Sequence, residues 1–319
     1  MNSEGKLNII KRNTVEIVTE KELIDLLKKK KTPVAYCGYE PNGPIHLGHF
    51  VTITKLKDLE RAGFKVIILL ADIHAMLNRK GTESEIKKEV ESWKKTLKAI
   101  GIKAEIVLGS SFQFSKEYQF DVMKMAQSST IQRGLRSMQE VARDVENATV
   151  SQLWYPLMQV VDIKHLQVDV AVGGLEQRKI HMLAKDSENS LKHEFIALHT
   201  PLITSLKGPG SKMSKSIPGS GISLQDSKEE IKNSIGNAYC PEKIAQDNPI
   251  LQINKLIVFP ILQNLNITRP TKFGGNKEYS SYEELETDYT TGKLHPMDLK
   301  NATALALEDI INPIRSKLR

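Results

Sequence analysis

The sequence has little cysteine and no hydrophobic run long enough to cross a membrane. Its two cysteines, Cys37 and Cys240, cannot form a metal site by themselves. So few cysteines favour a reduced compartment, and we expect a cytoplasmic protein. The apolar run at residues 66–71 has the length of a strand, whereas a membrane span needs roughly 18 residues. Because the N-terminus is polar and charged, we expect neither a secretory signal nor membrane association.

Several common catalytic patterns are also missing. Nothing near the residues that carry the chemistry, described below, resembles a Walker phosphate loop, a zinc site or a serine-type triad, which argues against those chemistries. Its 319 residues suffice for one large or two modest domains, and 40% hydrophobic with 26% charged residues is ordinary for a globular protein. A net charge of +7 and a pI of about 9.1 fit a polyanionic partner without requiring one.

Apolar runs alternate with helical patterns over the first two-thirds of the chain. We expect strands at 34–38, 65–71, 104–109 and 168–172, and helices at 46–62, 84–100, within 116–166, and from Leu175. This alternation predicts βαβ units and a parallel sheet. The pattern Thr19-x-x-Glu22 ahead of Leu23 predicts a capping box at the start of a further short helix.

The pattern changes after Gly221, where helices are expected at 226–237 and 297–317, separated by loops. We therefore expect an α/β protein with two domains. Residues 1–211 would form the parallel-sheet catalytic domain with inserted helices. Residues 212–319 would contain a glycine-flanked loop followed by a smaller, mainly helical domain.

Two short strings carry most of the functional information, namely His46-Leu47-Gly48-His49 and Lys212-Met213-Ser214-Lys215-Ser216. The first string opens a helix after a strand, where unpaired backbone N–H groups and the helix dipole favour phosphate. Gly48 lets a ring or sugar approach the backbone, and the two histidines share a helical face. Taken alone, the first string could be a plain helix start and the second a solvated loop.

The two strings suit adenylation, in which a carboxylate attacks the α-phosphate of ATP and pyrophosphate leaves. This reaction needs positioning and neutralisation of phosphate charge more than covalent participation by the protein. Lys212 and Lys215 lie in a loop bounded by glycine and proline, so both cations can close over the pyrophosphate.

Together, in this order and about half a chain apart, the strings resemble the two signatures of class I aminoacyl-tRNA synthetases. Segments 35–49, 69–77, 155–163, 168–182 and 295–301 further resemble tyrosyl-tRNA synthetases of the archaeal and eukaryotic type, in the compact archaeal form. The resemblance spans residues 10–318. It implies a Rossmann-type catalytic domain, a helical anticodon-binding domain, a homodimer, and the substrates L-tyrosine, tRNA(Tyr) and ATP with Mg²⁺.

The resemblance also assigns roles to individual residues. It implies that catalysis and ATP binding involve His46, Gly48, His49, Lys212 and Lys215. It implies that L-tyrosine is bound by Tyr36, Tyr155, Gln159, Asp162 and Gln177. It places Arg136, Arg178 and Lys179 near the tRNA acceptor stem, where the family reads the first base pair, and Phe273, His295 and Asp298 at the anticodon.

Physical arguments bear on some of these residues independently. Asp162 lies in an apolar helical segment, where an unpaired carboxylate costs several kcal/mol. We therefore expect polar partners for this carboxylate, and a substrate phenol could be one of them. Tyr155, Gln159 and Asp162 fall on one helical face because they are spaced by four and three. Tyr36 alone reads as a core aromatic residue, and Asp298 alone as a helix-start residue that favours the dipole.

Three other functions share some of these features. A tryptophanyl-tRNA synthetase has the same fold and signatures, but the pair Tyr36 and Asp162 suits a phenol better than an indole. A small nucleotidylyltransferase also uses a His-x-Gly-His helix, yet it would not explain the helical region after Gly221. A paralogue that only binds RNA would not need the histidines and lysines of the two strings.

Overall fold

The computed structural model describes residues 2–140, 147–214 and 217–318, which form two compact units. Unit 1 consists of Met1–Asn42, Lys55–Lys94 and Ile102–Pro201, and unit 2 consists of Gly43–Thr54, Lys95–Gly101 and Leu202–Arg319. The two units are therefore not separated by a single boundary in the sequence. Two short segments of the N-terminal half, including the one with the histidine string, group with the C-terminal half.

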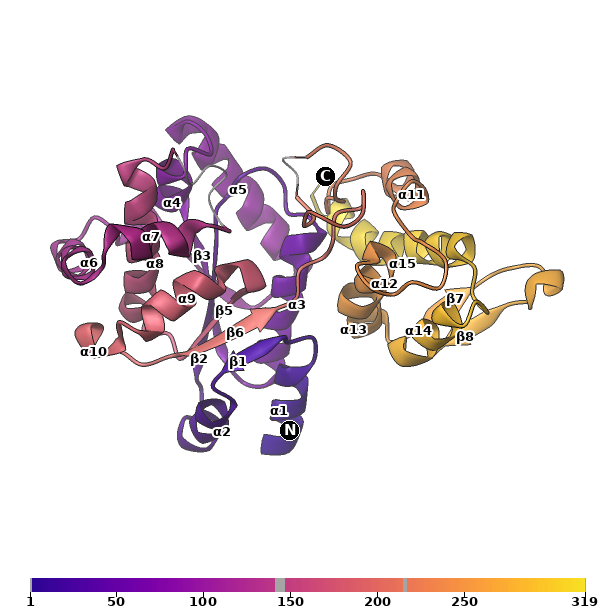
Figure 1. Ribbon diagram of the computed structural model, residues 1–319, viewed down its shortest axis with the longest axis horizontal. Coiled ribbons are helices and arrows are strands. Elements are labelled where there is room, and N and C mark those ends of the chain that lie inside the picture. Colours follow the sequence, from indigo (N-terminus) through magenta and orange to yellow (C-terminus); the bar gives the residue numbers. More distant parts are fainter. Residues whose placement is uncertain (1, 141–146, 215–216, 319) are drawn as a thin grey trace. The chain divides into compact units, whose positions relative to one another are not determined.

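Unit 1 is built on a six-stranded sheet with the order β1-β6-β5-β2-β3-β4 (Figure 1). The strands are β1 (Glu16–Val18), β2 (Val34–Tyr39), β3 (Lys65–Leu70), β4 (Ala104–Leu108), β5 (Val170–Gly174) and β6 (Ile196–Thr200). All neighbouring pairs are parallel except β1 and β6, which are antiparallel. The predicted parallel sheet is thus confirmed, with one antiparallel strand added at its edge.

Helices connect these strands. They are α1 (Ser3–Lys11), α2 (Glu20–Lys29), α3 (Leu47–Arg61), α4 (Asp72–Leu77), α5 (Glu83–Ile100), α6 (Lys116–Ser128), α7 (Ile131–Met138), α8 (Val150–His165), α9 (Arg178–Lys185) and α10 (Glu188–Leu191), with 3₁₀ turns η1 (Gly109–Ser111) and η2 (Leu175–Gln177). Helix α8 packs against α4, α6, α7 and α9. It is buried along most of its length, including the whole stretch from Tyr155 to Ile163.

The strand order reverses direction at β2. From β2 the chain adds β3 and β4 on one side, while β5 and β6 lie on the other side. Open parallel sheets bind ligands beyond the carboxyl ends of the strands at such a switch point. In unit 1 those ends belong to β2 and β5, and Tyr36 lies on β2 opposite Ala171 of β5.

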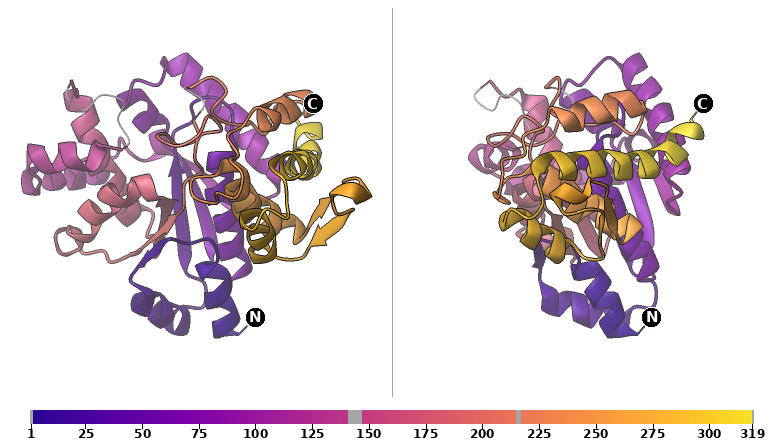
Figure 2. Two further views of the ribbon diagram at one scale, coloured as in Figure 1. Left: turned by 45° about the vertical axis from the view of Figure 1, so that its right-hand side comes forward. Right: turned by 90° about the vertical axis from the view of Figure 1, so that its right-hand side faces the viewer.

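Unit 2 contains α11 (Lys228–Gly236), α12 (Pro249–Ile253), the π-helical segment η3 (Asn254–Val258), α13 (Phe259–Leu262), β7 (Leu265–Ile267), η4 (Thr271–Phe273), β8 (Lys277–Tyr279), α14 (Tyr282–Thr290) and α15 (Pro296–Ser316). The long yellow helix in Figure 2 is α15, which packs against α11, α12, η3, α13 and β7. Strands β7 and β8 form an antiparallel pair.

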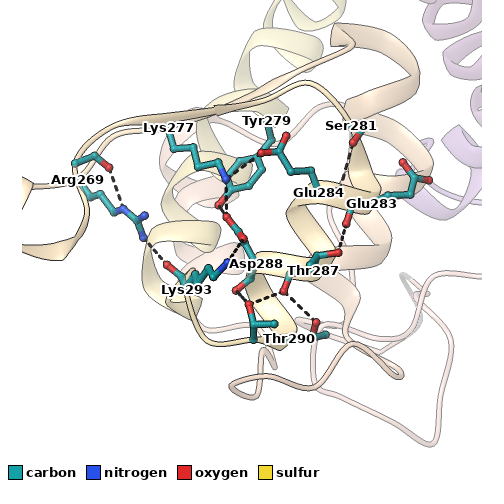
Figure 3. Close-up of polar contacts among 12 residues, drawn as sticks. Arg269, Lys277, Tyr279, Ser281, Glu283, Glu284, Thr287, Asp288, Thr290 and Lys293 are labelled. Atoms are coloured by element: carbon teal, nitrogen blue, oxygen red, sulfur yellow. Dashed lines mark hydrogen bonds and ion pairs between the residues drawn. The ribbon is translucent and has the colours of Figure 1, made fainter.

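A carboxylate attaches β8 to α14. Asp288 on α14 accepts hydrogen bonds from Lys277 Nζ (2.6 Å) and from the Tyr279 hydroxyl (3.0 Å), and Lys293 Nζ lies 3.8 Å away (Figure 3). Lys277 and Tyr279 both belong to β8, so one side chain binds two residues of the strand. The hydrogen bonds lower the pKa of Asp288 and keep it ionised.

Most expected elements are present with shifted ends, and the capping box of Thr19 and Glu22 is confirmed at α2. The expected helix at 46–62 begins one residue later, because His46 forms an isolated β-bridge with Ser223. The expected strand at 168–172 begins at Val170, because Gln167 has a φ of +51° in a turn where Val168 N–H bonds Ile163 O. Strands β1, β6, β7 and β8 were not predicted.

Candidate active site

Tyr36 is enclosed in the centre of the sheet of unit 1. Its side chain is 1% exposed, and it pairs with Ile67 of β3 and Ala171 of β5. Its hydroxyl lies over Gly38, where an added Cβ would come within 2.8 Å of the oxygen. Burial and the neighbouring Asp162 carboxylate raise the pKa of Tyr36, so its hydroxyl stays protonated and can donate a hydrogen bond.

Asp162 lies on α8 and is fully buried. Its Oδ1 accepts hydrogen bonds from Gln113 Nε2 and from the Tyr118 hydroxyl, each at 2.8 Å. Its Oδ2 has no hydrogen-bond partner among the described residues, and the nearby His74 Nε2, 3.6 Å away, has none either. Half of this carboxylate is therefore held by the protein, and the other half is left for another donor.

The charge on this pair depends on burial. Burial raises the pKa of Asp162 to about 7, although the bonds from Gln113 and Tyr118 oppose the rise. Burial lowers the pKa of His74 to about 4. Near pH 7 His74 is therefore neutral and does not form an ion pair with Asp162 despite their proximity.

The other three expected tyrosine-binding residues lie close to Asp162 along the chain or in space. Tyr155 is buried on α8, and its ring meets the His74 ring edge-on with centroids 4.6 Å apart. Gln159, also on α8, donates from Nε2 to Gln177 Oε1 at 3.1 Å. Gln177 is the last residue of η2, which directly follows β5. The hydrogen bond between Gln159 and Gln177 therefore connects α8 to the carboxyl end of β5, at the switch point of the sheet.

Sequence reasoning missed the residues that hold Asp162. A polar partner for this carboxylate was expected, but Gln113 and Tyr118 are 49 and 44 positions away in the sequence. His74, 88 positions before Asp162, was missed for the same reason. The only available signal was the energetic cost of a buried carboxylate, which predicts that donors exist without identifying them.

In unit 2 the histidine string is fixed by two backbone contacts to a distant segment. Leu47 N–H bonds Ile222 O, and Leu224 N–H bonds Ile45 O, both at 2.9 Å. The rings of His46 and His49 stack with centroids 3.8 Å apart. A Cβ at Gly48 would come within 2.8 Å of the His46 ring, so glycine permits this close approach of ring and backbone.

One residue of the lysine string, Met213, lies close to the histidine string. A Cβ at Gly48 would be 3.8 Å from Met213 O, although the two strings are far apart in sequence. Met213 is buried, and its N–H bonds Ile203 O at 2.8 Å, whereas the neighbouring Lys212 is exposed. Lys215 and Ser216 lie outside the described residues.

The basic residues expected at the acceptor stem lie on two helices of unit 1 that pack together, α7 and α9. Arg136 is exposed on α7. Arg178 begins α9 and makes two hydrogen bonds to Glu16, from Nε (2.7 Å) and Nη2 (2.9 Å). Lys179 Nζ lies 3.0 Å from Glu140 Oε1, which makes an exposed ion pair.

The three residues expected at the anticodon lie in unit 2, one in η4 and two at the start of α15. Phe273 is 61% exposed in η4, and the His295 side chain caps α15 by accepting from Met297 N–H. Asp298 lies 3.7 Å from Arg269, whose Nε donates to Gly275 O in the loop after Phe273. Figure 3 shows Arg269 also reaching the backbone of Lys293, which precedes α15. The position of Asp298 in the first turn also fits a purely structural role.

The residues that the structure describes contain neither a cluster of potential metal ligands nor a membrane-spanning helix. Within those residues, no group of three or more His, Cys, Asp or Glu side chains could hold a metal ion. None of the described helices is both long and apolar enough to cross a membrane.

Residues 28–312 match the family described as tRNA synthetases class I (W and Y). The tyrosine–tRNA ligase of Archaeoglobus fulgidus is 48% identical, over 100% of this chain and 99% of that protein. The tyrosine–tRNA ligase of Methanopyrus kandleri is 49% identical, over 99% of this chain and 98% of that protein. The chain belongs to the tyrosyl-tRNA synthetase family.

A solved structure of this family agrees over the whole chain. The crystal structure of the Archaeoglobus fulgidus tyrosyl-tRNA synthetase complexed with L-tyrosine is 48% identical, covers 100% of both chains and superposes with a TM-score of 0.96. The α/β class I synthetase fold expected from the sequence is therefore confirmed. These similarities also favour the tyrosine enzyme over the tryptophan enzyme, since both of these curated relatives, at 48% and 49% identity, are named as tyrosine–tRNA ligases.

The pKa of Asp162 generates a prediction about stability. A carboxyl group whose pKa is raised on folding binds its proton more tightly in the native state, so the contribution of Asp162 to the free energy of unfolding falls as pH rises from about 4 towards and through 7. The full difference is on the order of 4 kcal/mol. Asp162→Asn does not titrate, so its free energy of unfolding relative to wild type should increase between pH 4.5 and pH 8 when both are measured by urea denaturation.

Glu105→Gln is the matched control, because Glu105 is a half-exposed carboxylate of the same unit that pairs with Lys65 on the surface. Its stability relative to wild type should change by less than about 1 kcal/mol over the same range. Equal pH dependence for Asp162→Asn and Glu105→Gln would show that Asp162 does not have the raised pKa.

Proposed function

We propose that this protein is a tyrosine–tRNA ligase that activates L-tyrosine with ATP and transfers it to tRNA(Tyr), using the residues assigned below. The carrying observation is the buried Oδ2 of Asp162, which has no hydrogen-bond partner among the described residues. A tyrosine phenol donates its proton to this oxygen. The Tyr36 hydroxyl, which stays protonated, donates to the phenol oxygen in turn.

The polar end of the amino acid is bound by the residues near the carboxyl end of β5. Gln159 and Gln177 form an amide pair whose carbonyl oxygens accept from the substrate ammonium, and the Tyr155 hydroxyl is the third contact. Tyr155, Gln159 and Asp162 occupy successive turns of α8, so one helix spans the substrate from ammonium to phenol.

ATP is bound by the two signature strings of unit 2. The imidazoles of His46 and His49 and the backbone at Gly48 face the nucleotide, and Lys212 and Lys215 neutralise the departing pyrophosphate. The proximity of Gly48 and Met213 supports the assignment of both strings to one ATP site, since these two residues belong to different strings. Mg²⁺ enters with ATP and is held by its phosphates, where it offsets their charge.

The reaction proceeds in two steps. The substrate carboxylate attacks the α-phosphorus of ATP, the bond to the bridging oxygen breaks, and pyrophosphate leaves with its electron pair. A hydroxyl of the terminal adenosine of tRNA then attacks the acyl carbon, and AMP leaves. The protein contributes orientation of both substrates and cations that stabilise the leaving pyrophosphate.

The tRNA is bound at two places. Arg136, Arg178 and Lys179 contact the acceptor stem, and Phe273, His295 and Asp298 contact the anticodon. In the anticodon loop the bases are unpaired, so an exposed ring such as Phe273 can stack on one of them. In domain terms, residues 1–211 form the catalytic domain that holds the tyrosine site and the histidine string. Residues 212–319 contain the signature loop, with its two catalytic lysines, and the anticodon contacts.

We further propose that the enzyme is a cytoplasmic homodimer. Three large apolar side chains in and just before α6 are strongly exposed: Phe114 (67%), Phe120 (59%) and Met123 (57%). Grouped exposed side chains of this kind mark protein interfaces, and a symmetric pair buries the same patch on both subunits.

Substrate choice tests the proposed pocket. Among twenty amino acids, L-tyrosine should support the fastest pyrophosphate exchange. Asp162→Ala should lower kcat/KM for tyrosine about 10- to 100-fold, because a hydrogen bond to a charged group contributes about 1.5–3 kcal/mol. Tyr36→Phe should lower it about 2- to 10-fold, because a hydrogen bond between neutral groups contributes about 0.5–1.5 kcal/mol. Both variants should narrow the advantage of tyrosine over phenylalanine. Glu105→Gln should leave both values unchanged. Wild-type kcat/KM for tyrosine in both pocket variants would contradict the assignment.

Asp298→Asn tests the anticodon contact, with Asp309→Asn as an exposed control on the same helix. A carboxylate can accept two N–H groups from a guanine edge, a contact worth about 1–3 kcal/mol. Asp298→Asn should therefore slow aminoacylation about 10-fold or more and weaken discrimination among first-base anticodon variants, while tyrosine-dependent pyrophosphate exchange stays unchanged. Lower thermal stability with unchanged anticodon preference would instead assign Asp298 a helix-start role.

A further inference from the structure

A chain of polar contacts in unit 1 connects two buried histidines to Arg178. His181 Nδ1 lies 3.0 Å from His199 Nε2, and His199 Nδ1 lies 3.0 Å from Glu16 Oε2. Glu16 then accepts two hydrogen bonds from the Arg178 guanidinium, at 2.7 and 2.9 Å. Both histidines are 1% exposed or less, whereas the Arg178 side chain is 46% exposed, so the chain runs from the interior to the surface.

The carboxylate of Glu16 determines where the protons of this chain lie. Glu16 is an acceptor, so His199 donates from Nδ1–H, which leaves its Nε2 as an acceptor for His181 Nδ1–H. Burial lowers the pKa of both histidines, that of His181 to about 3, so both rings are neutral. Arg178 and His199 lower the pKa of Glu16 in turn, and the carboxylate stays charged.

The position of Glu16 is fixed at the level of the backbone as well. Glu16 on β1 and His199 on β6 are direct partners in the antiparallel pair, and Val15 N–H bonds His199 O at 2.9 Å. An isolated surface Arg–Glu pair contributes little because both side chains move freely. Here the carboxylate is also bound by a buried ring, so it offers Arg178 a fixed anchor.

This anchor leaves one edge of the guanidinium for a ligand. Arg178 uses Nε–H and one N–H of Nη2 for Glu16, so the edge formed by Nη1 and the second Nη2 hydrogen points away from the carboxylate. That edge carries two parallel N–H donors, which match two oxygens of a phosphate or the O6 and N7 atoms of guanine.

We propose that Glu16 is a positioning residue for tRNA, holding Arg178 with its outer edge towards the acceptor stem, and that His199 and His181 support Glu16 from the interior. This inference rests on the proposed contact of Arg178 with the acceptor stem. It assigns a role in RNA recognition to β1, a strand that contains none of the residues expected at the site.

Glu16→Gln is the informative variant, because glutamine has the same shape and lacks the charge that orients the guanidinium. It should lower kcat/KM for tRNA(Tyr) about 10-fold, mainly through a higher KM, and weaken discrimination against an altered first base pair. Tyrosine-dependent pyrophosphate exchange should stay within twofold of wild type. Glu20→Gln is the control, since it removes an exposed ion pair between Glu20 at the start of α2 and Lys11 at the end of α1.

A double-mutant cycle separates positioning from other roles. Once Arg178→Ala has removed the guanidinium, adding Glu16→Gln should cause no further loss in tRNA charging. A further loss as large as in the wild-type background, or a parallel fall in pyrophosphate exchange, would overturn the proposal. If Arg178→Ala lowers charging and Glu16→Gln does not, the acceptor contact stands and the positioning role is wrong. If Arg178→Ala itself leaves charging unchanged, the acceptor contact fails, and the positioning role fails with it.

Discussion

A carboxylate buried in an apolar helix of unit 1 is costly, and the proposed tyrosine site depends on how that carboxylate is satisfied. Asp162 is fully buried on α8 and receives hydrogen bonds from Gln113 and Tyr118 on one oxygen alone. An unsatisfied buried oxygen costs about 1–3 kcal/mol or more for a charged group, which a functional site can retain when its ligand supplies the missing donor. The Tyr36 hydroxyl, also buried, lies in the adjacent sheet and is positioned by the absence of a side chain at Gly38.

The proposed ATP site in unit 2 is built differently from the proposed tyrosine site in unit 1. Backbone hydrogen bonds on either side of the bridge between His46 and Ser223 join the histidine string to residues 222–224. A Cβ at Gly48 would lie 3.8 Å from Met213 O of the lysine string. No buried charge is needed there, because the phosphates bring their own charge and the protein supplies exposed cations such as Lys212. In the proposed function, desolvated polar groups thus recognise the substrate side chain, and cations and close backbone approach recognise the nucleotide.

The sequence predicted the parts of this protein that local pattern controls. Alternating strands and helices, the Thr19 capping box and the shared face of Tyr155, Gln159 and Asp162 all follow from spacing along the chain. What remained hidden depends on tertiary contacts. The three-residue strand β1 is too short to carry a pattern, and Gln113 and Tyr118 meet Asp162 across more than 40 residues. The roles of the individual site residues remain predictions, because they depend on bound substrates.

A crystal structure of this protein with L-tyrosine tests the central claim most directly. The account predicts that the phenol oxygen lies about 2.7 Å from Asp162 Oδ2 and within hydrogen-bond distance of the Tyr36 hydroxyl, with Gln113 and Tyr118 still on Oδ1. It also predicts that the ammonium lies beside Gln159 and Gln177. A bound tyrosine whose phenol oxygen contacts neither Asp162 nor Tyr36 would contradict the account.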